Sequence, residues 1–92
     1  MLPNVEVTYL QGHAPVQAEG SINGKPFYFR ARGQYWTLYV GGESAVDAPE
    51  WEYEERYGLG LYDAGYMTHE EALRFLLEAA SRCPLNEKET KQ

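Results

Sequence analysis

The side chains best suited to chemistry gather in residues 43–63. This segment has seven acids and one base, Arg56, so its charge of −6 equals the formal net charge of the whole 92-residue chain. Three of the acids alternate with aromatic side chains around residue 52. The acids are Glu43, Asp47, Glu50, Glu52, Glu54, Glu55 and Asp63.

A pair of carboxylates can act as general acid and base, but such groups need burial or a close partner to shift their pKa. On a strand, Glu50, Glu52 and Glu54 share one exposed side, which predicts a solvated acidic edge. A zinc site needs three or four ligands, and nothing in the sequence brings His13 and His69 together. We therefore expect no enzyme activity, no metal and no cofactor.

An acidic, aromatic segment is suited to binding a basic surface. Carboxylates pair with arginines in a bidentate manner, and buried aromatics are the usual anchors of interfaces. Along one side of a strand, side chains repeat every ~6.5–7 Å, close to the phosphate spacing of a single nucleic-acid strand. The predicted partner-binding residues are Glu43, Asp47, Glu50, Trp51, Glu52, Tyr53, Glu54, Glu55 and Asp63.

Four strands are expected before this segment, over residues 5–9, 16–22, 25–32 and 35–40, because apolar and polar residues alternate there. Asn23-Gly24 and Gly33-Gln34 are typical two-residue hairpin turns. These turns predict that Ala18 faces Phe29 and that Phe29 faces Leu38. Small side chains then lie opposite large ones on one apolar face. The face comprises Val16, Ala18, Gly20, Phe27, Phe29, Ala31, Trp36, Leu38 and Val40.

Residues 51–57 are expected to form a fifth strand with its aromatics inward and its acids outward. Glu55 interrupts that alternation, which predicts a bulge or an early strand end. Residues 58–65 contain three of the nine glycines, which predicts a flexible connector.

A helix is predicted after this connector. Thr68 and Glu71 form a Thr-x-x-Glu capping box, and Pro84 stops the helix. Its apolar stripe comprises Ala72, Phe75, Leu76, Ala79, Ala80 and Cys83, widened by Leu73 and Leu77.

These elements predict an α+β fold: an antiparallel sheet of four to five strands with one C-terminal helix packed on one face. Residues 1–85 form a single domain, and residues 86–92 form a flexible charged tail. With 43% hydrophobic residues, the chain is too apolar to be disordered.

The opposite face of the sheet is a second candidate surface, with Tyr28, Arg30, Arg32, Tyr35 and Tyr39. Tyrosines and arginines on a sheet can stack single-stranded bases or bind a peptide. A solvated face with tyrosines chosen for β-propensity is the simpler interpretation. The net charge of −6 disfavours direct nucleic-acid binding.

In size and composition the chain resembles the anti-CRISPR proteins, small acidic proteins of phages and mobile elements. The likeness rests on the acids at 47, 50, 52, 54, 55 and 63 with Trp51 and Tyr53 between them. It implies a non-catalytic inhibitor that acts as a nucleic-acid mimic and blocks a basic site on a host protein or ribonucleoprotein complex. An immunity-type protein that neutralises a toxin is an alternative, and an acidic segment can also serve solubility alone.

The N-terminus lacks the basic and apolar regions of a signal peptide, and no apolar run approaches ~20 residues. Cys83 is the only cysteine, so no internal disulfide can form. We expect a cytoplasmic protein without a membrane partner, in the host cytoplasm if it is phage-encoded. It would be a monomer or, through its exposed aromatics, a homodimer.

Overall fold

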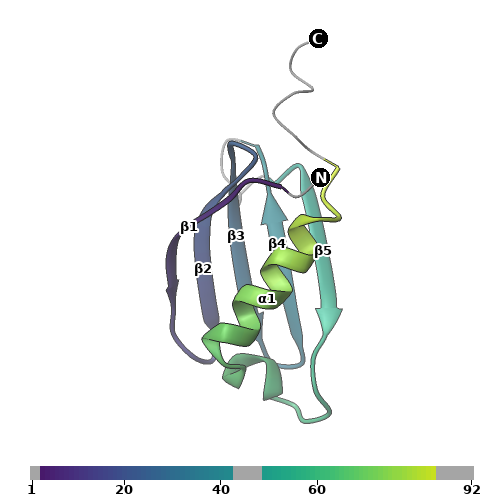
Figure 1. Ribbon diagram of the computed structural model, residues 1–92. Coiled ribbons are helices and arrows are strands. Elements are labelled where there is room, and N and C mark those ends of the chain that lie inside the picture. Colours follow the sequence, from purple (N-terminus) through teal and green to yellow (C-terminus); the bar gives the residue numbers. More distant parts are fainter. Residues whose placement is uncertain (1–2, 43–48, 85–92) are drawn as a thin grey trace.

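The computed structural model describes residues 3–42 and 49–84 and contains a five-stranded antiparallel sheet with one long helix (Figure 1). The predicted α+β fold is confirmed. The elements are β1 (Val5–Gln11), β2 (Val16–Ile22), β3 (Lys25–Arg32), β4 (Tyr35–Val40), β5 (Trp51–Arg56), the 3-10 helix η1 (Asp63–Tyr66) and α1 (His69–Ala80). The tail at residues 86–92 lies outside the described residues.

The strands follow one another in the order β1-β2-β3-β4-β5. The predicted register is confirmed, because Ala18 pairs with Phe29, and Phe29 pairs with Leu38. At the first turn Asn23 and Gly24 have φ values of 52° and 83°, as a type I′ turn requires. Turn chemistry and alternation therefore position the strands from β2 to β4.

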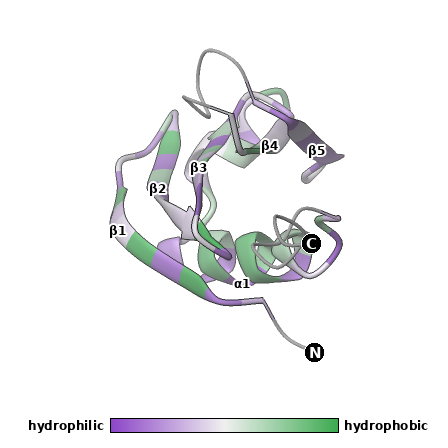
Figure 2. Cartoon of the chain, turned by 90° about the horizontal axis from the view of Figure 1, so that it is seen from above, coloured by the Kyte–Doolittle hydropathy of each residue, from purple (hydrophilic) through white to green (hydrophobic). Residues whose placement is uncertain are grey.

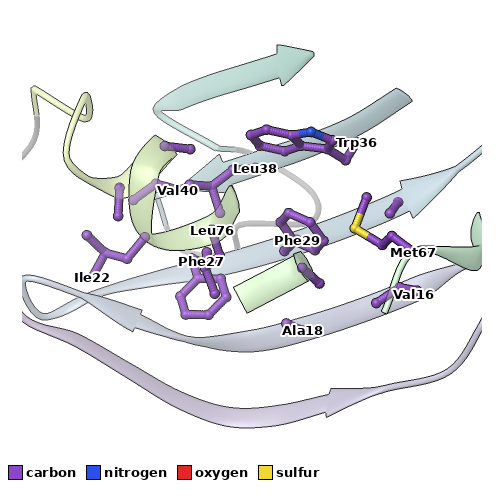
Figure 3. Close-up of a cluster of buried hydrophobic side chains, with 14 of the residues drawn as sticks. Val16, Ala18, Ile22, Phe27, Phe29, Trp36, Leu38, Val40, Met67 and Leu76 are labelled. Atoms are coloured by element: carbon purple, nitrogen blue, oxygen red, sulfur yellow. The ribbon is translucent and has the colours of Figure 1, made fainter. Parts of the chain in front are cut away.

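Helix α1 crosses the inner face of the sheet, and Figure 2 shows the sheet curving around it. The core lies between these two layers, with Phe29, Trp36 and Leu38 from the sheet and Leu76 from the helix all buried (Figure 3). Besides the predicted apolar face, this core includes Ile22 at the end of β2, side chains of α1, and Met67 from the segment just before the helix. Among the described residues, no side chain of the opposite, outer face of the sheet belongs to this core.

The helix begins with the predicted capping box. The backbone N–H of Glu71 donates to Thr68 Oγ1, and the backbone N–H of Thr68 donates to Glu71 Oε1, both at 3.0 Å. Tyr57 also donates its hydroxyl proton to Glu71 Oε1, at 2.8 Å. The cap thus joins the end of the sheet to the start of the helix.

The predicted apolar stripe of the helix is too wide on the side that faces away from the sheet. Leu73 and Leu77 do not widen the buried stripe, because their side chains are 37% and 45% exposed. The curved sheet covers a single side of the helix, so only a narrow stripe is buried. The helix also ends at Ala80, and Cys83 follows it as a half-buried residue next to the core.

Strand β5 corrects a second prediction. It has no bulge, since Glu55 pairs with Trp36 in the ladder, but it does end early, at Arg56, one residue before the predicted end. Glu55 is accommodated on the inner side because the Tyr53 hydroxyl donates a hydrogen bond to its carboxylate. The connector that follows is also more structured than predicted, since it contains η1. Within the described residues, no helix has the length and apolar character to cross a bilayer.

Glu71 gives the fold a pH dependence that can be measured. Its pKa lies below the ordinary value of 4.5, first because the Thr68 backbone N–H donates to it and then because the Tyr57 hydroxyl does. The folded state therefore binds the proton less well, so the stabilisation is present above pH 4.5 and is lost as the pH falls through the lower folded pKa. Glu71→Gln keeps the capping geometry but removes the titration.

We expect urea unfolding at a series of acidic pH values to show a shallower loss of stability in Glu71→Gln than in the wild type. Glu70→Gln, an exposed change in the same helical turn, is the matched substitution with which Glu71→Gln is compared. The assignment is contradicted if Glu71→Gln keeps the wild-type slope.

Candidate functional site

The two surfaces that the sequence predicts separately are joined on the outer face of the sheet. Strand β5 pairs with β4 so that Glu52 lies beside Tyr39, and Glu54 lies beside Thr37. In turn, Tyr39 lies beside Tyr28, and Thr37 lies beside Arg30 on β3. The outward acids and the tyrosine and arginine residues therefore form one continuous face, here called the outer face.

The outer face has three cross-strand rows of different charge. The first row is acidic at both ends, with Glu19 and Glu52 on either side of two tyrosines. The second row mixes charges, and the third row is basic. The rows run Glu19–Tyr28–Tyr39–Glu52, Gln17–Arg30–Thr37–Glu54 and Arg32–Tyr35–Arg56.

Two tyrosines stand at the centre of the acidic row. The rings of Tyr28 and Tyr39 stack with centroids 6.0 Å apart. The Tyr28 hydroxyl donates to Gln17 Oε1 at 2.7 Å, and burial raises the pKa of this hydroxyl. The pair is therefore a half-buried aromatic platform, held by the ring stack and by the hydrogen bond of Tyr28.

The basic side of the outer face is hollowed. A shallow depression of about 400 Å³ lies over β3 and β4 and is lined by Arg30, Arg32, Tyr35, Thr37 and Tyr39, together with the β3–β4 turn. It includes every residue of the second predicted surface except Tyr28. Two guanidinium groups in one depression can bind an oxyanion with paired, charge-assisted hydrogen bonds.

Arg30 is the residue of this depression that has a buried hydrogen-bond donor without an acceptor. Its Nε atom is buried and, among the described residues, has no hydrogen-bond acceptor. Within the same part of the chain the one ion pair is Lys25–Glu50, so none of Arg30, Arg32 and Arg56 is neutralised by a carboxylate within 4 Å. A buried donor without an acceptor destabilises the fold by about 1–3 kcal/mol, which favours a role outside folding.

The carboxylates of Glu52 and Glu54 are exposed on the outer face, and Glu54 accepts a weak hydrogen bond from Thr37 Oγ1 at 3.4 Å. Glu50 lies just before β5 and is also exposed, with an oxygen 3.7 Å from Lys25 Nζ. These three acids confirm the predicted exposed alternation. Glu43 and Asp47 lie outside the described residues.

The aromatic neighbours of these acids lie on the other side of the sheet. Trp51 and Tyr53 are half-buried and pack against the core, and Glu55 shares that side. The hydrogen bond to Glu55 is the main cause of the raised pKa of the Tyr53 hydroxyl, and the Arg82 guanidinium lies 5.6 Å from the Tyr53 ring centroid. The aromatics that accompany Glu52 and Glu54 are therefore Tyr28 and Tyr39.

Asp63 does not lie on the outer face with Glu52 and Glu54. Its carboxylate instead closes the turn at the start of η1. Asp63 Oδ2 accepts from the backbone N–H groups of Leu59 and Gly60 at 3.2 and 2.9 Å. This local role follows from the habit of aspartate in turns. A Gly-x-x-Asp spacing is the sequence signal that could have indicated it.

Two features were missed by sequence reasoning. His13 and His69 stack with ring centroids 5.1 Å apart, and His69 Nε2 lies 2.9 Å from the Gly12 carbonyl oxygen. Packing of the β1–β2 loop on η1 brings them together, through a bond from the Ala14 N–H to the Gly65 carbonyl at 2.7 Å. No local pattern signals this contact. Among the described residues, no group of three metal-ligating side chains occurs.

The second missed feature is an exposed apolar loop beside the basic row. Leu59 is 93% exposed, and Leu61, Tyr62 and Tyr66 are also largely exposed. The loop is held next to the β3–β4 turn because the Ala64 N–H donates to the Gly33 carbonyl at 2.9 Å. Exposed apolar clusters of this kind are typical of interaction surfaces.

Comparison of the chain with protein-family models, with curated proteins and with solved structures found no significant match.

Proposed function

We propose that this domain is a non-catalytic binding protein whose outer face covers a basic surface on a partner protein. The carboxylates of Glu52 and Glu54 pair with arginines or lysines of the partner. The stacked Tyr28 and Tyr39 rings supply the aromatic contact between them. The basic surface would be a nucleic-acid-binding site, and covering it would inhibit the partner, as an anti-CRISPR protein does.

The observation that carries this proposal is the position of two exposed acids on the same face as a half-buried tyrosine pair. Carboxylates without an internal ion pair keep their charge available for a partner. Rigid tyrosines lose little conformational entropy on binding and are common at the centres of interfaces. Within the described residues, Glu52 and Glu54 make no ion pair.

Charge complementarity also supports a basic partner over a nucleic acid. The chain carries −6 net charge, so a polyphosphate would be repelled over most of its surface. Acidic residues on a rigid strand repeat every ~6.5–7 Å, which suits a groove that normally holds phosphates. The partner class is therefore a nucleic-acid-binding protein rather than the nucleic acid.

The test is a quantitative pull-down with the double variant Glu52→Lys/Glu54→Lys. We expect it to lose the basic proteins that the wild type captures from a lysate of the source cells, by at least tenfold in mass-spectrometric intensity. Each reversal replaces an attraction by a repulsion, and mispaired charges at an interface cost several kcal/mol. The captured partner is then assayed for nucleic-acid binding with and without the domain.

The matched control is Glu70→Lys/Glu78→Lys, which changes the net charge equally but lies on exposed positions of α1, in the other layer. It keeps wild-type capture if the outer face is the binding site. Equal capture by the outer-face variant and the control would refute the proposal. Far-ultraviolet circular dichroism establishes that both variants are folded.

A further inference from the structure

We propose that the depression at Arg30 and Arg32 is a carboxylate-binding site that receives an acidic residue of the partner. This inference deepens the proposed function and rests on the same outer face. It changes the expected partner from a uniformly basic surface to a segment with one acid and one base. The base meets Glu52, and the acid enters the depression.

The chemistry of the depression is the first argument. Arg30 and Arg32 both line it, and among the described residues neither has a carboxylate within 4 Å. The Nε of Arg30 lacks an acceptor. A small rotation of the Arg30 side chain would let one incoming carboxylate accept from its Nε and Nη together, which is the bidentate geometry that guanidinium groups prefer.

The surroundings favour a single carboxylate over a polyphosphate. Glu54 lies in the same cross-strand row as Arg30, and Glu52 lies one row away. An extended nucleic acid would have to pass these acids, and each phosphate near them would be repelled. One carboxylate on a peptide avoids this, because the next charge along the peptide can be positive.

The spacing of the rows gives the partner a recognisable pattern. Arg32, which lines the depression, lies in the basic row, and Glu52 lies in the acidic row. The two rows are four residues apart along the strands, about 13 Å at ~3.3 Å per residue, and β3 and β5 are two strand spacings apart, about 9.5 Å. An extended partner segment that crosses the face diagonally therefore needs its acid and its base about four or five positions apart.

The experiment uses the peptide acetyl-Glu-Thr-Val-Thr-Lys-amide as the probe and side-chain ¹⁵N spectra of the full chain as the readout. Because Arg30 lines the depression, its Nε–H resonance should change when a carboxylate binds there. We expect the peptide to shift this resonance, and replacement of its Glu by Gln to weaken binding about tenfold, because a charge-assisted hydrogen bond is lost. An oligothymidylate strand is the competing probe.

Arg30→Met keeps most of the length of the side chain. It removes both the charge and the Nε–H donor that has no acceptor. We expect this variant to lose the tenfold preference for Glu over Gln while its midpoint of thermal unfolding rises. A merely structural arginine would give the opposite change in stability. Arg74→Met, on an exposed position of α1, is the matched control and keeps the preference.

The outcomes separate this inference from the function on which it rests. Equal affinity for the Glu and Gln peptides, an unshifted Arg30 Nε–H at millimolar peptide, or a preference for oligothymidylate overturns the carboxylate site. Loss of affinity only when the peptide Lys is replaced would leave the basic-partner proposal standing without it. A Glu preference that is independent of the Lys would support the depression and refute the basic partner.

Discussion

Replacement of Trp36 by alanine is expected to remove most of the stability of the domain. Trp36 is 1% exposed, and its ring lies 5.5 Å from Phe29, 5.8 Å from Tyr53 and 5.3 Å from Phe75, measured between centroids. It therefore joins β3, β5 and α1 at one point. Truncation of such a tryptophan costs about 3–5 kcal/mol, against roughly 5–15 kcal/mol for a whole domain.

The measurement is thermal unfolding followed by circular dichroism, in which we expect the midpoint to fall by more than about 12 °C. Trp51→Ala is the matched control, since Trp51 is half-buried and stacks on Tyr53 alone among the described rings. Its effect should be less than half as large. Comparable losses in the two variants would contradict the central position of Trp36.

The consequence reaches the outer face, because Tyr35, Thr37 and Tyr39 alternate with Trp36 along β4. A change on the buried side of this strand would disorder the depression on its exposed side. Trp36→Ala should therefore lose partner binding together with its folded signal. Glu52→Lys/Glu54→Lys should lose binding alone, and this contrast separates the stability of the fold from recognition.

Gly20→Ala is expected to be the second most damaging change, because there is no room for a Cβ at this position. An ideal Cβ on Gly20 would lie 1.9 Å from the carbonyl oxygen of Glu6 and 2.9 Å from Cε2 of Phe27. The first contact is with the backbone of β1, which can retreat only by giving up its ladder to β2. Overpacking of this kind costs about 1–3 kcal/mol or more, and we expect the upper end.

Urea unfolding is the measurement, and Ser21→Ala is the control on the next residue of the same strand. Ser21 pairs with Glu6 and Pro26 from the outer side, so its truncation should change stability by about 0.5 kcal/mol or less. Stability of Gly20→Ala within about 1 kcal/mol of the wild type would mean that β1 does not approach β2 so closely. Since β1 is remote from the depression, any folded fraction of Gly20→Ala should keep partner binding.

The strands from β2 to β4 and the start of α1 could be predicted because their signals are local. Asn23-Gly24 determines its own turn and thereby the pairing of every residue on β2 and β3. Thr68 and Glu71 satisfy one another within three residues. In both cases the interacting groups are close along the chain, so the residue types alone are enough to predict the local geometry.

The candidate site could be predicted only in two separate parts. The outward residues of β5 and the outward residues of β3 and β4 each follow from alternation. Their meeting depends on the register between β4 and β5. The connection from Val40 to Trp51 is longer than a two-residue hairpin turn, so its sequence does not determine that register. The structure pairs Leu38 with Tyr53, because this places the aromatic side of β5 against Trp36.

By itself, the sequence determined a meander with one apolar face, a capped helix to cover it and an excess of acid in residues 43–63. Only the tertiary structure decided that Glu52 and Glu54 share a face with Arg30 and Arg32, and that Asp63 closes a turn instead of joining them. The physical reason is the separation along the chain. Turns and caps are decided by neighbouring residues, whereas a shared face is decided by packing between segments that no local pattern connects.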